Sequence, residues 1–404
     1  MFYPLPIEKV LSFLVGKDPF VLLETIREDP ENYLSYLFIE PFGKIETRSL
    51  LDLPDFFEKI ENALSRGYYL AGFFSYEAGF GFEENLQKAI KKKPSFPLAR
   101  LYLFHSPLIF DHRTGTFSKK VRFPSVKFPK RYDLSRPSFN VGPDEYHRNI
   151  TKIKDLIAAG DTYQVNYTFK VRFHFSGSPF GLYLDLRRKQ SVCYSVFIKD
   201  KNSFILSLSP ELFFRKTGPK VTVRPMKGTI GRGKNLSEDR KQADILHKNF
   251  KDRSENLMIV DLLRNDLGKV SKIGTVKVNS LFDVEKYETL FQMTSTISAT
   301  LKPSLPFYQL FQALFPSGSV TGAPKIRTMK IIRELEKTER KVYTGAVGFF
   351  SPNRDAVFNI AIRTVLITDS HGEMGTGSGI LFDSDAQREY AECKLKAFFL
   401  TQKN

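Results

Sequence analysis

Lys227 stands in a glycine-rich basic segment, RPMKGTIGRG (224–233), directly after the alternating run VTV (221–223). Glycine-rich basic loops can hold a phosphate, coat a basic surface or present a lysine for chemistry. A lysine is nucleophilic only when it is neutral, so its pKa must fall from about 10.4 through desolvation or neighbouring cations such as Arg224. The local pattern leaves these three interpretations open.

A second segment, RSENLMIVDLLRNDLGKV (253–270), has the spacing of an amphipathic helix. Ser254 is expected to cap this helix, and the apolar face would include Leu257 and Leu263. Glu255 would then lie in the first turn, where a carboxylate usually does no more than interact with the helix dipole. This segment alone therefore does not identify a site.

The C-terminal helix expected over 384–401 carries Glu389 and Glu392, which are three residues apart and therefore share one face. Lys396 follows Glu392 by four residues, so an exposed ion pair is the simplest interpretation. The alternative is a magnesium site, because Mg²⁺ binds oxygen atoms from few protein carboxylates together with substrate and water. The spacing fits both.

The loop SGSVTGAPK (317–325) is polar and flexible, and Pro324 is well placed at the start of the helix that follows. Free backbone N–H groups at such a helix start favour an anion. The loop is not a nucleotide-binding Walker loop, because Lys325 is followed by Ile326 rather than by Ser or Thr. Taken alone, it is interpreted as a helix cap.

These segments belong to strands and helices that occur in blocks. Strand-like runs and one helical pattern fill residues 1–117, a Pro- and Lys-rich linker or surface excursion follows over 118–143, and the main region is 144–404. Because strands and helices do not alternate regularly, we expect an α+β fold with largely antiparallel sheets. The helical patterns of the chain lie at 53–67, 144–160, 237–267, 306–314, 324–337 and 384–401.

Composition narrows the class of protein. The 404 residues carry a formal net charge of +17, but basic residues are spread along the chain, and the densest clusters, KAIKKK (88–93) and KFPKR (127–131), fall in expected loops. A nucleic-acid-binding protein is therefore a remote alternative, since solvated lysines or an anionic substrate explain the charge better. The two cysteines suggest neither disulfides nor a metal site. Without a leader or a long apolar run, a soluble cytoplasmic protein with no membrane partner is expected.

Five segments stand in the order found in the chorismate-utilizing enzymes: RPMKGTIGRG, ENLMIVDLLRNDLGKV, PSGSVTGAPK, YTGAVGFF and GTGSGILFDSDAQREYAECKLKA. The chain therefore resembles this family, which includes the large subunits of anthranilate synthase and aminodeoxychorismate synthase, with isochorismate and salicylate synthases as relatives. The match covers about 143–400, and FVLLET (20–25) with GFFSYEAGFGFE (72–83) extends it close to full length. The resemblance implies two largely antiparallel sheets packed together with helices on the outside.

The resemblance implies that Glu255 and Glu392 bind Mg²⁺, with Glu389 as a further ligand or a water partner. Chorismate is a dianion, and Mg²⁺ at its ring carboxylate would neutralise charge and draw electrons toward that group as a nucleophile adds to the ring. Glu211, in LSLSPELFF, matches the general acid that helps the ring hydroxyl to leave. The acidic side chains thus divide between metal binding and acid catalysis.

The resemblance also assigns other residues to the binding of chorismate. Arg363 and Tyr343 match positions that hold the enolpyruvyl side, and glycine permits close approach at a carboxylate-binding turn. Gln292 replaces a histidine of many relatives, so the charge-stabilising role of that histidine is not transferred, although the amide can hydrogen-bond an oxygen. The implied turn and the other contacts are Gly377, Ser378, Gly379, Gly228, Thr229, Ser319 and Lys396.

Two positions distinguish among the reactions of the family. Gln164 stands where isochorismate and salicylate synthases have a water-activating lysine, which favours an amine-transferring enzyme, because neutral ammonia needs no activation. Lys227 stands where anthranilate synthases usually have alanine. A lysine there is a feature of the aminodeoxychorismate synthases, in which it is thought to attack C2 of the ring. The resemblance thus implies a route toward 4-aminobenzoate and folate, with anthranilate synthesis as the alternative.

Ammonia is expected to come from a separate glutamine amidotransferase subunit that forms a heterodimer with this chain. Neither Cys193 nor Cys393 lies in the Gly-x-Cys-x-Gly context that a glutaminase needs. The VLLET segment resembles the tryptophan-binding motif of the large subunits, but Thr25 stands where serine is common. Tryptophan binding is therefore left open.

Overall fold

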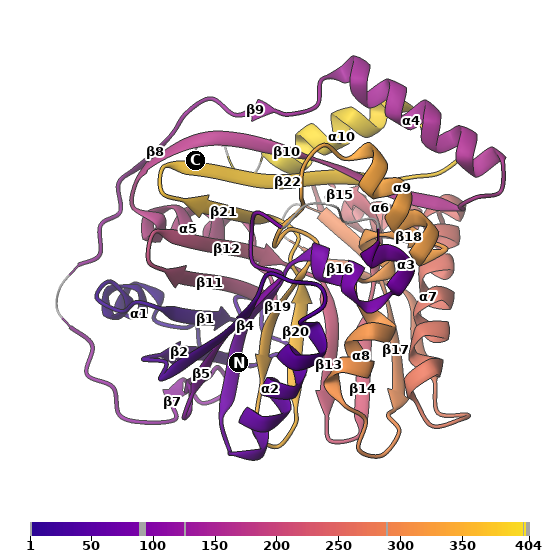
Figure 1. Cartoon of the computed structure of the whole chain (residues 1–404). Helices are drawn as coiled ribbons and strands as arrows, with labels where there is room; N and C mark the ends of the chain where they lie inside the picture. Colours follow the sequence, from indigo (N-terminus) through magenta and orange to yellow (C-terminus); the bar gives the residue numbers. More distant parts are fainter. Residues whose placement is uncertain (1, 89–93, 125–126, 288–289, 399, 401–404) are drawn as a thin grey trace.

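The computed structural model describes residues 2–88, 94–124, 127–287, 290–398 and 400, which form two antiparallel β-sheets packed together with helices outside (Figure 1). The α+β fold expected from the sequence is confirmed. Within the described residues, the larger sheet has the strand order β18 (Gly322–Ala323), β10 (Gln164–Gly177), β22 (His371–Ile380), β21 (Thr364–Thr368), β12 (Ser203–Ser209), β11 (Tyr194–Asp200), β1 (Phe20–Glu24), β2 (Leu34–Ile39), β6 (Leu108–Asp111) and β7 (Thr116–Phe117), with β8 (Tyr132–Leu134) and β9 (Ser138–Phe139) beside β10.

The smaller sheet, like the larger one, combines strands from distant parts of the chain. β4 near the N-terminus pairs with β19 near the C-terminus, as β1 pairs with β11 in the larger sheet. Strands from 1–117 and from 144–404 are therefore direct neighbours in both sheets. The order in the smaller sheet is β15 (Met226–Gly231), β17 (Leu290–Thr300), β14 (Lys220–Arg224), β13 (Leu212–Thr217), β20 (Ala356–Ile360), β19 (Ala346–Phe350), β4 (Tyr69–Phe74), β5 (Ala99–Phe104) and β3 (Gly43–Thr47), with β16 (Lys277–Lys286) beside β17.

The first strand shows how the apolar pattern builds the layers. Val21 joins a buried cluster formed by both sheets, whereas Phe20 and Leu22 point to the opposite face and pack with the outer helices α1 and α5. Because both faces are covered, β1 reads as the continuous apolar run FVLLE rather than as an alternating one.

Helices cover the outer face of each sheet. Those on the larger sheet are α1 (Ile7–Leu14) and α5 (Pro179–Lys189), and those on the smaller sheet are α2 (Leu53–Ser65), α7 (Phe250–Val270) and α8 (Phe307–Leu314). A third group packs beside β10 and β22 and comprises α4 (Pro143–Ala158), α9 (Lys325–Leu335) and α10 (Ala386–Phe398). The remaining short or peripheral helices are α3 (Glu84–Gln87), α6 (Leu236–Lys248), η1 (Tyr76–Phe82) and η2 (Gly318–Val320).

The helix expected over 237–267 is in fact two helices, α6 and α7. Asn249 ends α6, and its side chain accepts a hydrogen bond from Asp252 N at 3.1 Å, so Asn249 is the cap of α7. The expected cap at Ser254 is therefore wrong, and Glu255 lies in the second turn of the helix. Leu257 is half exposed rather than part of the buried face.

Of the two basic clusters, KFPKR lies within the described residues and KAIKKK lies mostly outside them. KAIKKK lies outside the described residues except for Lys88. In KFPKR, Phe128 is buried, and Lys130 forms an ion pair with Glu8 at 2.8 Å. In the part of the chain that the structure describes, no helix is long and apolar enough to cross a membrane.

Candidate active site

Lys227 lies in β15 at the edge of the smaller sheet, and its side chain reaches toward β22 and β10 of the larger sheet. A Cβ atom added to Gly379 in β22 would lie 3.1 Å from Lys227 Nζ and 2.2 Å from Gln164 Nε2. The missing side chain at residue 379 therefore makes room for the amine and the amide. The candidate site lies where the two sheets meet at these strands.

The environment of Lys227 favours the neutral amine. Burial lowers the pKa of Lys227, and the nearby ammonium of Lys396 lowers it further. The carboxylates of Glu255, Glu211 and Glu392 act in the opposite direction, since negative charge stabilises the ammonium form. The pKa is lowered overall, as a nucleophilic lysine requires.

Glu211 lies where the chain crosses from β12 of the larger sheet to β13 of the smaller one. Its side chain is buried, and Oε1 has no hydrogen-bond partner among the described residues. Burial raises the pKa of Glu211 to about 7, although the Ser319 hydroxyl, the Lys227 ammonium and the Met226 N–H lower it. A carboxyl group with this pKa is substantially protonated near neutral pH, as a general acid must be.

Arg363 lies at a second crossing, between β20 and β21. The two crossings are adjacent, because Ile360 N donates to Glu211 O at 3.0 Å and Leu208 N donates to Arg363 O at 3.1 Å. Arg363 has a φ of +51°, and such strained backbone clusters at functional sites. Its guanidinium donates to Gln190 Oε1, and burial lowers its pKa. A half-buried guanidinium of this kind suits an anionic ligand.

A row of glycines in β22 borders the candidate site. Gly375, Gly377 and Gly379 alternate along the strand and therefore share one face. The ring of Tyr343 covers this face at Gly375, where an added Cβ would lie 2.0 Å from Tyr343 Cδ1. Tyr343 and Lys227 therefore flank the same face of β22.

The predicted carboxylate-binding turn is a strand segment in the structure. Ser378 lies on the opposite face of β22, where its hydroxyl is 2.9 Å from Tyr146 Oη. Lys396 Nζ donates to Gly377 O at 3.1 Å, so this carbonyl is already engaged. Only the backbone and the two flanking glycines face the site, and their binding of a carboxylate stays a prediction.

Two acidic side chains, Glu255 and Glu392, approach Lys227 from two helices, and Glu389 lies near Glu255. Glu255 comes from α7, and burial raises its pKa, with a further rise from the negative charge of Glu389 in α10. Glu392 Oε1 forms an ion pair with Lys396 Nζ at 2.6 Å. The surface ion pair expected for this helix is therefore present, and it lies beside the candidate nucleophile.

This acidic set fits Mg²⁺ only together with other ligands. Within the described ranges, no group of three or more His, Cys, Asp or Glu side chains is placed to hold a metal. Mg²⁺ usually takes one or two protein carboxylates and completes its shell with substrate oxygens and water. A cation would also offset the burial and the neighbouring negative charges that raise the pKa of Glu255. The chemistry of the donors agrees with Mg²⁺, and the ligand assignment stays a prediction.

Three further predicted contacts lie near Lys227: Gly228 and Thr229 follow it in β15, and Gln292 lies on the neighbouring strand β17. Gly228 has a φ of +85°, and a Cβ there would lie 2.9 Å from Asp252 Cβ, so glycine is needed at this bulge. Thr229 is exposed and is opposite Gln292 of β17. Among the described residues, no hydrogen bond or ion pair joins Thr229 or Gln292 to Lys227, so their contacts with substrate stay predictions.

The two arginines of this segment have other partners. Arg224 Nη2 forms an ion pair with Glu31 Oε2 at 3.1 Å, and Arg232 binds Asp239. The expectation that Arg224 lowers the pKa of Lys227 needs correction, because the principal cation that does so is Lys396.

Comparison with known proteins decides the family. The family model described as chorismate binding enzyme matches residues 19–402. The chain belongs to the chorismate-binding enzymes.

Relatives within the family include two kinds of synthase. The chain is 40% identical over 255 residues to aminodeoxychorismate synthase component 1 of Bacillus subtilis. This alignment covers 63% of this chain and 54% of the relative, so the chain spans about half of the relative's length. It is 34% identical over 377 residues to anthranilate synthase component 1 of Saccharolobus solfataricus, covering 92% and 86%. Among solved structures, anthranilate synthase component I from Streptococcus pneumoniae matches with a TM-score of 0.81 at 25% identity, over 94% of each chain.

Two residues of this chorismate-binding enzyme enter the site without having been assigned to it from the sequence. Gln164 was used only to distinguish reactions, yet its buried Oε1 has no hydrogen-bond partner among the described residues. Asp252 lies against Gly228, and burial raises its pKa, with a further rise from Glu392. The sequence did contain a signal for Asp252, because it precedes Glu255 by three residues and therefore shares one face of the helix with it.

The chorismate-binding enzyme also contains a separate cavity of about 440 Å³ between its sheets. Thr25, Tyr36, Gly348 and Asn359 are among the residues that line it. The Thr25 hydroxyl donates to Leu34 O at 2.9 Å, so it is already hydrogen-bonded at the cavity edge.

Proposed function

We propose that this chorismate-binding enzyme is the large subunit of an aminodeoxychorismate synthase and replaces the C4 hydroxyl of chorismate by an amine. The observation that supports this choice is the position of Lys227, whose half-buried side chain reaches Gln164 and Gly379 and lies close enough to Glu211 to affect its pKa. Relatives named aminodeoxychorismate synthase component 1 share 40% and 35% of aligned residues. A lowered lysine pKa is what covalent catalysis needs.

In the proposed first step, the neutral amine of Lys227 attacks C2 of the ring, the two conjugated ring double bonds each shift by one position, and the C4–O bond breaks. Glu211 gives its proton to the departing hydroxyl, which leaves as water. The lysine nitrogen then carries a positive charge, and Glu211 is a carboxylate. The nearby carboxylates that oppose the lowered pKa of Lys227 would stabilise this cationic adduct.

In the second step, ammonia attacks C4, the two ring double bonds shift back, and the bond between C2 and Lys227 breaks, which restores the neutral lysine. The Glu211 carboxylate takes the proton that the new ammonium group loses. The net change is chorismate plus ammonia to 4-amino-4-deoxychorismate plus water, with the enolpyruvyl group retained. We infer that a separate glutaminase subunit supplies the ammonia, in keeping with the relatives' designation as component 1.

The dianionic substrate would be held by groups on both sides of Lys227. Arg363 and Tyr343 would bind the enolpyruvyl carboxylate, and the strand backbone at Gly377 and Gly379 would approach the ring carboxylate. Glu255 and Glu392 would hold Mg²⁺, which when bound neutralises the ring carboxylate and favours addition to the ring. Glu392 must then exchange its ion pair with Lys396 for the metal.

The metal proposal gives a specific expectation for Glu255→Gln. We expect the Mg²⁺ concentration for half-maximal activity to rise by about tenfold or more, because the amide loses the charge that binds a hard cation. Initial rates at varied Mg²⁺ measure this. The matched control is Asp261→Asn, an exposed carboxylate on the same helix that pairs only with Arg264 among the described residues. An unchanged Mg²⁺ dependence in Glu255→Gln would exclude Glu255 as a ligand.

Anthranilate synthase is the second candidate, because the Saccharolobus solfataricus relative of that name aligns with 92% of the chain. A product assay separates the two reactions. With chorismate, ammonium and Mg²⁺, we expect a product that becomes 4-aminobenzoate only when an aminodeoxychorismate lyase is added. Fluorescent anthranilate formed without the lyase would instead establish the second function.

A further inference from the structure

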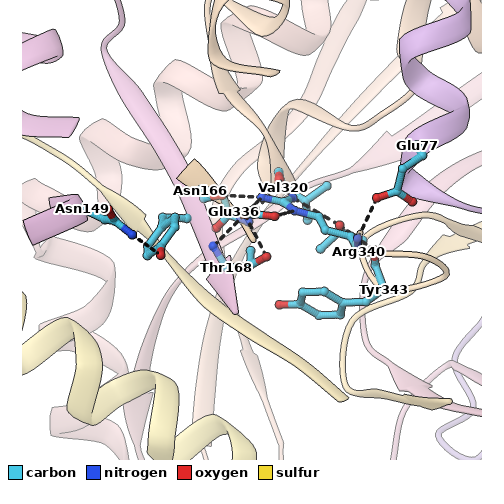
Figure 2. Close-up of polar contacts among 10 residues, drawn as sticks. Glu77, Asn149, Asn166, Thr168, Val320, Glu336, Arg340 and Tyr343 are labelled. Carbon is cyan, nitrogen blue, oxygen red and sulfur yellow. Dashed lines mark hydrogen bonds and ion pairs between the residues drawn. The ribbon is translucent and has the colours of Figure 1, made fainter. Parts of the chain in front are cut away.

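Arg340 is buried between α9 and β19, and its guanidinium uses every N–H that it has (Figure 2). Nε and Nη2 donate to the Glu336 carboxylate at 2.9 and 2.6 Å. The other three N–H groups donate to Val320 O at 2.8 Å, to Asn166 O at 2.6 Å and to Thr344 Oγ1 at 3.2 Å. Five donors thus meet five acceptors without a substrate.

The three acceptors other than Glu336 come from three segments that also carry predicted site residues. Val320 follows Ser319 in η2, and Thr344 follows Tyr343. Asn166 in β10 is the register partner of Gly379 in β22. One planar group therefore links the hydroxyl that contacts Glu211, the tyrosine over Gly375 and the strand pair that receives Lys227.

Two carboxylates extend this arrangement. Glu336 Oε1 also accepts from Thr168 N and Thr168 Oγ1, both at 2.9 Å, and Thr168 is the register partner of Gly377. Glu77, from the N-terminal motif GFFSYEAGFGFE, accepts from Arg340 N at 2.6 Å and from Lys341 N at 3.0 Å. Figure 2 shows Glu77 and Glu336 on opposite sides of Arg340. Side chain and backbone of Arg340 are both fixed.

We propose that Arg340 is a positioning residue for substrate binding. Its guanidinium holds three segments at fixed distances from one another: the loop that contains Ser319, the loop that contains Tyr343, and the paired strands β10 and β22. The inference rests on the proposed function, since these three segments would together bind chorismate. Arg340 touches no part of the proposed nucleophile or general acid, so its loss should weaken binding of chorismate more than it slows the chemistry. Positional errors near 1 Å in such groups are costly.

The test is the steady-state consumption of chorismate at saturating ammonium and Mg²⁺, with Arg340→Lys compared with wild type. Lysine keeps the charge but has three donors and no planar fork, so it cannot serve all three segments. We expect the KM for chorismate to rise by about tenfold or more and kcat to change by less than about threefold. In Arg340→Ala, added guanidinium ion should restore part of the lost affinity by occupying the vacated space.

Arg100→Lys is the matched control, because Arg100 is also largely buried and bridges the carboxylates of Glu46 and Asp200 but touches none of the three segments. Glu336→Gln is a milder second variant, for which a smaller rise in KM is expected. If Arg340→Lys and Glu336→Gln left KM at the Arg100→Lys value, or lowered only kcat, the inference would be overturned. A wild-type protein that consumed no chorismate would overturn the proposed function itself.

Discussion

Replacing Lys227 by alanine is expected to abolish formation of aminodeoxychorismate, with a loss of roughly a thousandfold or more in kcat. The alanine variant has no amine to form the bond at C2 that activates C4. Direct attack of ammonia at C2, the anthranilate route, does not need the lysine, so any residual amination should yield anthranilate. Chromatography of products from chorismate, ammonium and Mg²⁺ measures both outcomes.

The covalent role has a second readout in the wild-type protein. With chorismate but no ammonia, intact-mass measurement should show an adduct with the mass of chorismate less water, and Lys227→Ala should not form it. Lys216→Ala is a suitable control, because burial also lowers the pKa of Lys216, which bonds the carbonyls of Gly218 and Arg354. Unchanged aminodeoxychorismate turnover in Lys227→Ala would contradict the nucleophile role.

Replacing Glu211 by glutamine is expected to lower kcat by roughly 10²- to 10⁴-fold, because the amide cannot protonate the departing hydroxyl. Since burial raises the pKa of Glu211 to about 7, wild-type kcat should fall as pH rises through that value, when the acid form is lost. The variant should lack this limb. A pH profile of kcat for both proteins measures the difference, and an identical limb in the variant would rule out Glu211 as the acid.

The same substitution should stabilise the protein at alkaline pH. In the folded chain, the Glu211 carboxyl holds its proton up to about pH 7, whereas in the unfolded chain it loses it near pH 4.5. Folding thus takes up a proton between these values, and the free energy of unfolding falls as pH rises from about 4.5 to 7. Glutamine removes this contribution, so Glu211→Gln should gain on the order of 2–3 kcal/mol at pH 8 but little at pH 4.

Denaturant unfolding at the two pH values measures this gain. Glu77 carries the same kind of shift, with its pKa raised to about 7 by burial, so the wild-type slope contains at least two contributions. The difference between Glu211→Gln and wild type isolates one of them. Equal stability of the two proteins at pH 8 would mean that the Glu211 carboxylate is not destabilised by its surroundings.

The apolar patterns predicted the elements well where one face of a strand or helix is buried. The helix expected over 144–160 forms as α4, within a few residues of those bounds. The break between α6 and α7 was missed because an asparagine within a polar helical sequence does not by itself indicate that one helix ends and another begins. Asn249 acts as a cap only because the chain turns there.

The candidate site was predicted unevenly for a related reason. Side chains in recognisable motifs, such as Lys227 and Glu255, could be assigned, and the structure brings them together. Arg340 could not, because two of its acceptors are backbone carbonyls of distant segments, which local sequence does not reveal. Likewise, AVFNIAIRTVLIT reads as one strand, but at Arg363 the chain passes from one sheet to the other.

The mixed membership of the two sheets constrains how the enzyme can be made. β4, at residues 69–74, finds its neighbour β19 only at residues 346–350, and β1 must wait for β11. During synthesis on the ribosome, β1 therefore lacks β11 until about half of the chain has been made, and β4 lacks β19 until most of it has been made. Such long-range pairing slows folding, and it leaves apolar edges open to other molecules in the interval. The topology that assembles the site therefore prolongs the time for which apolar strand edges are exposed during synthesis.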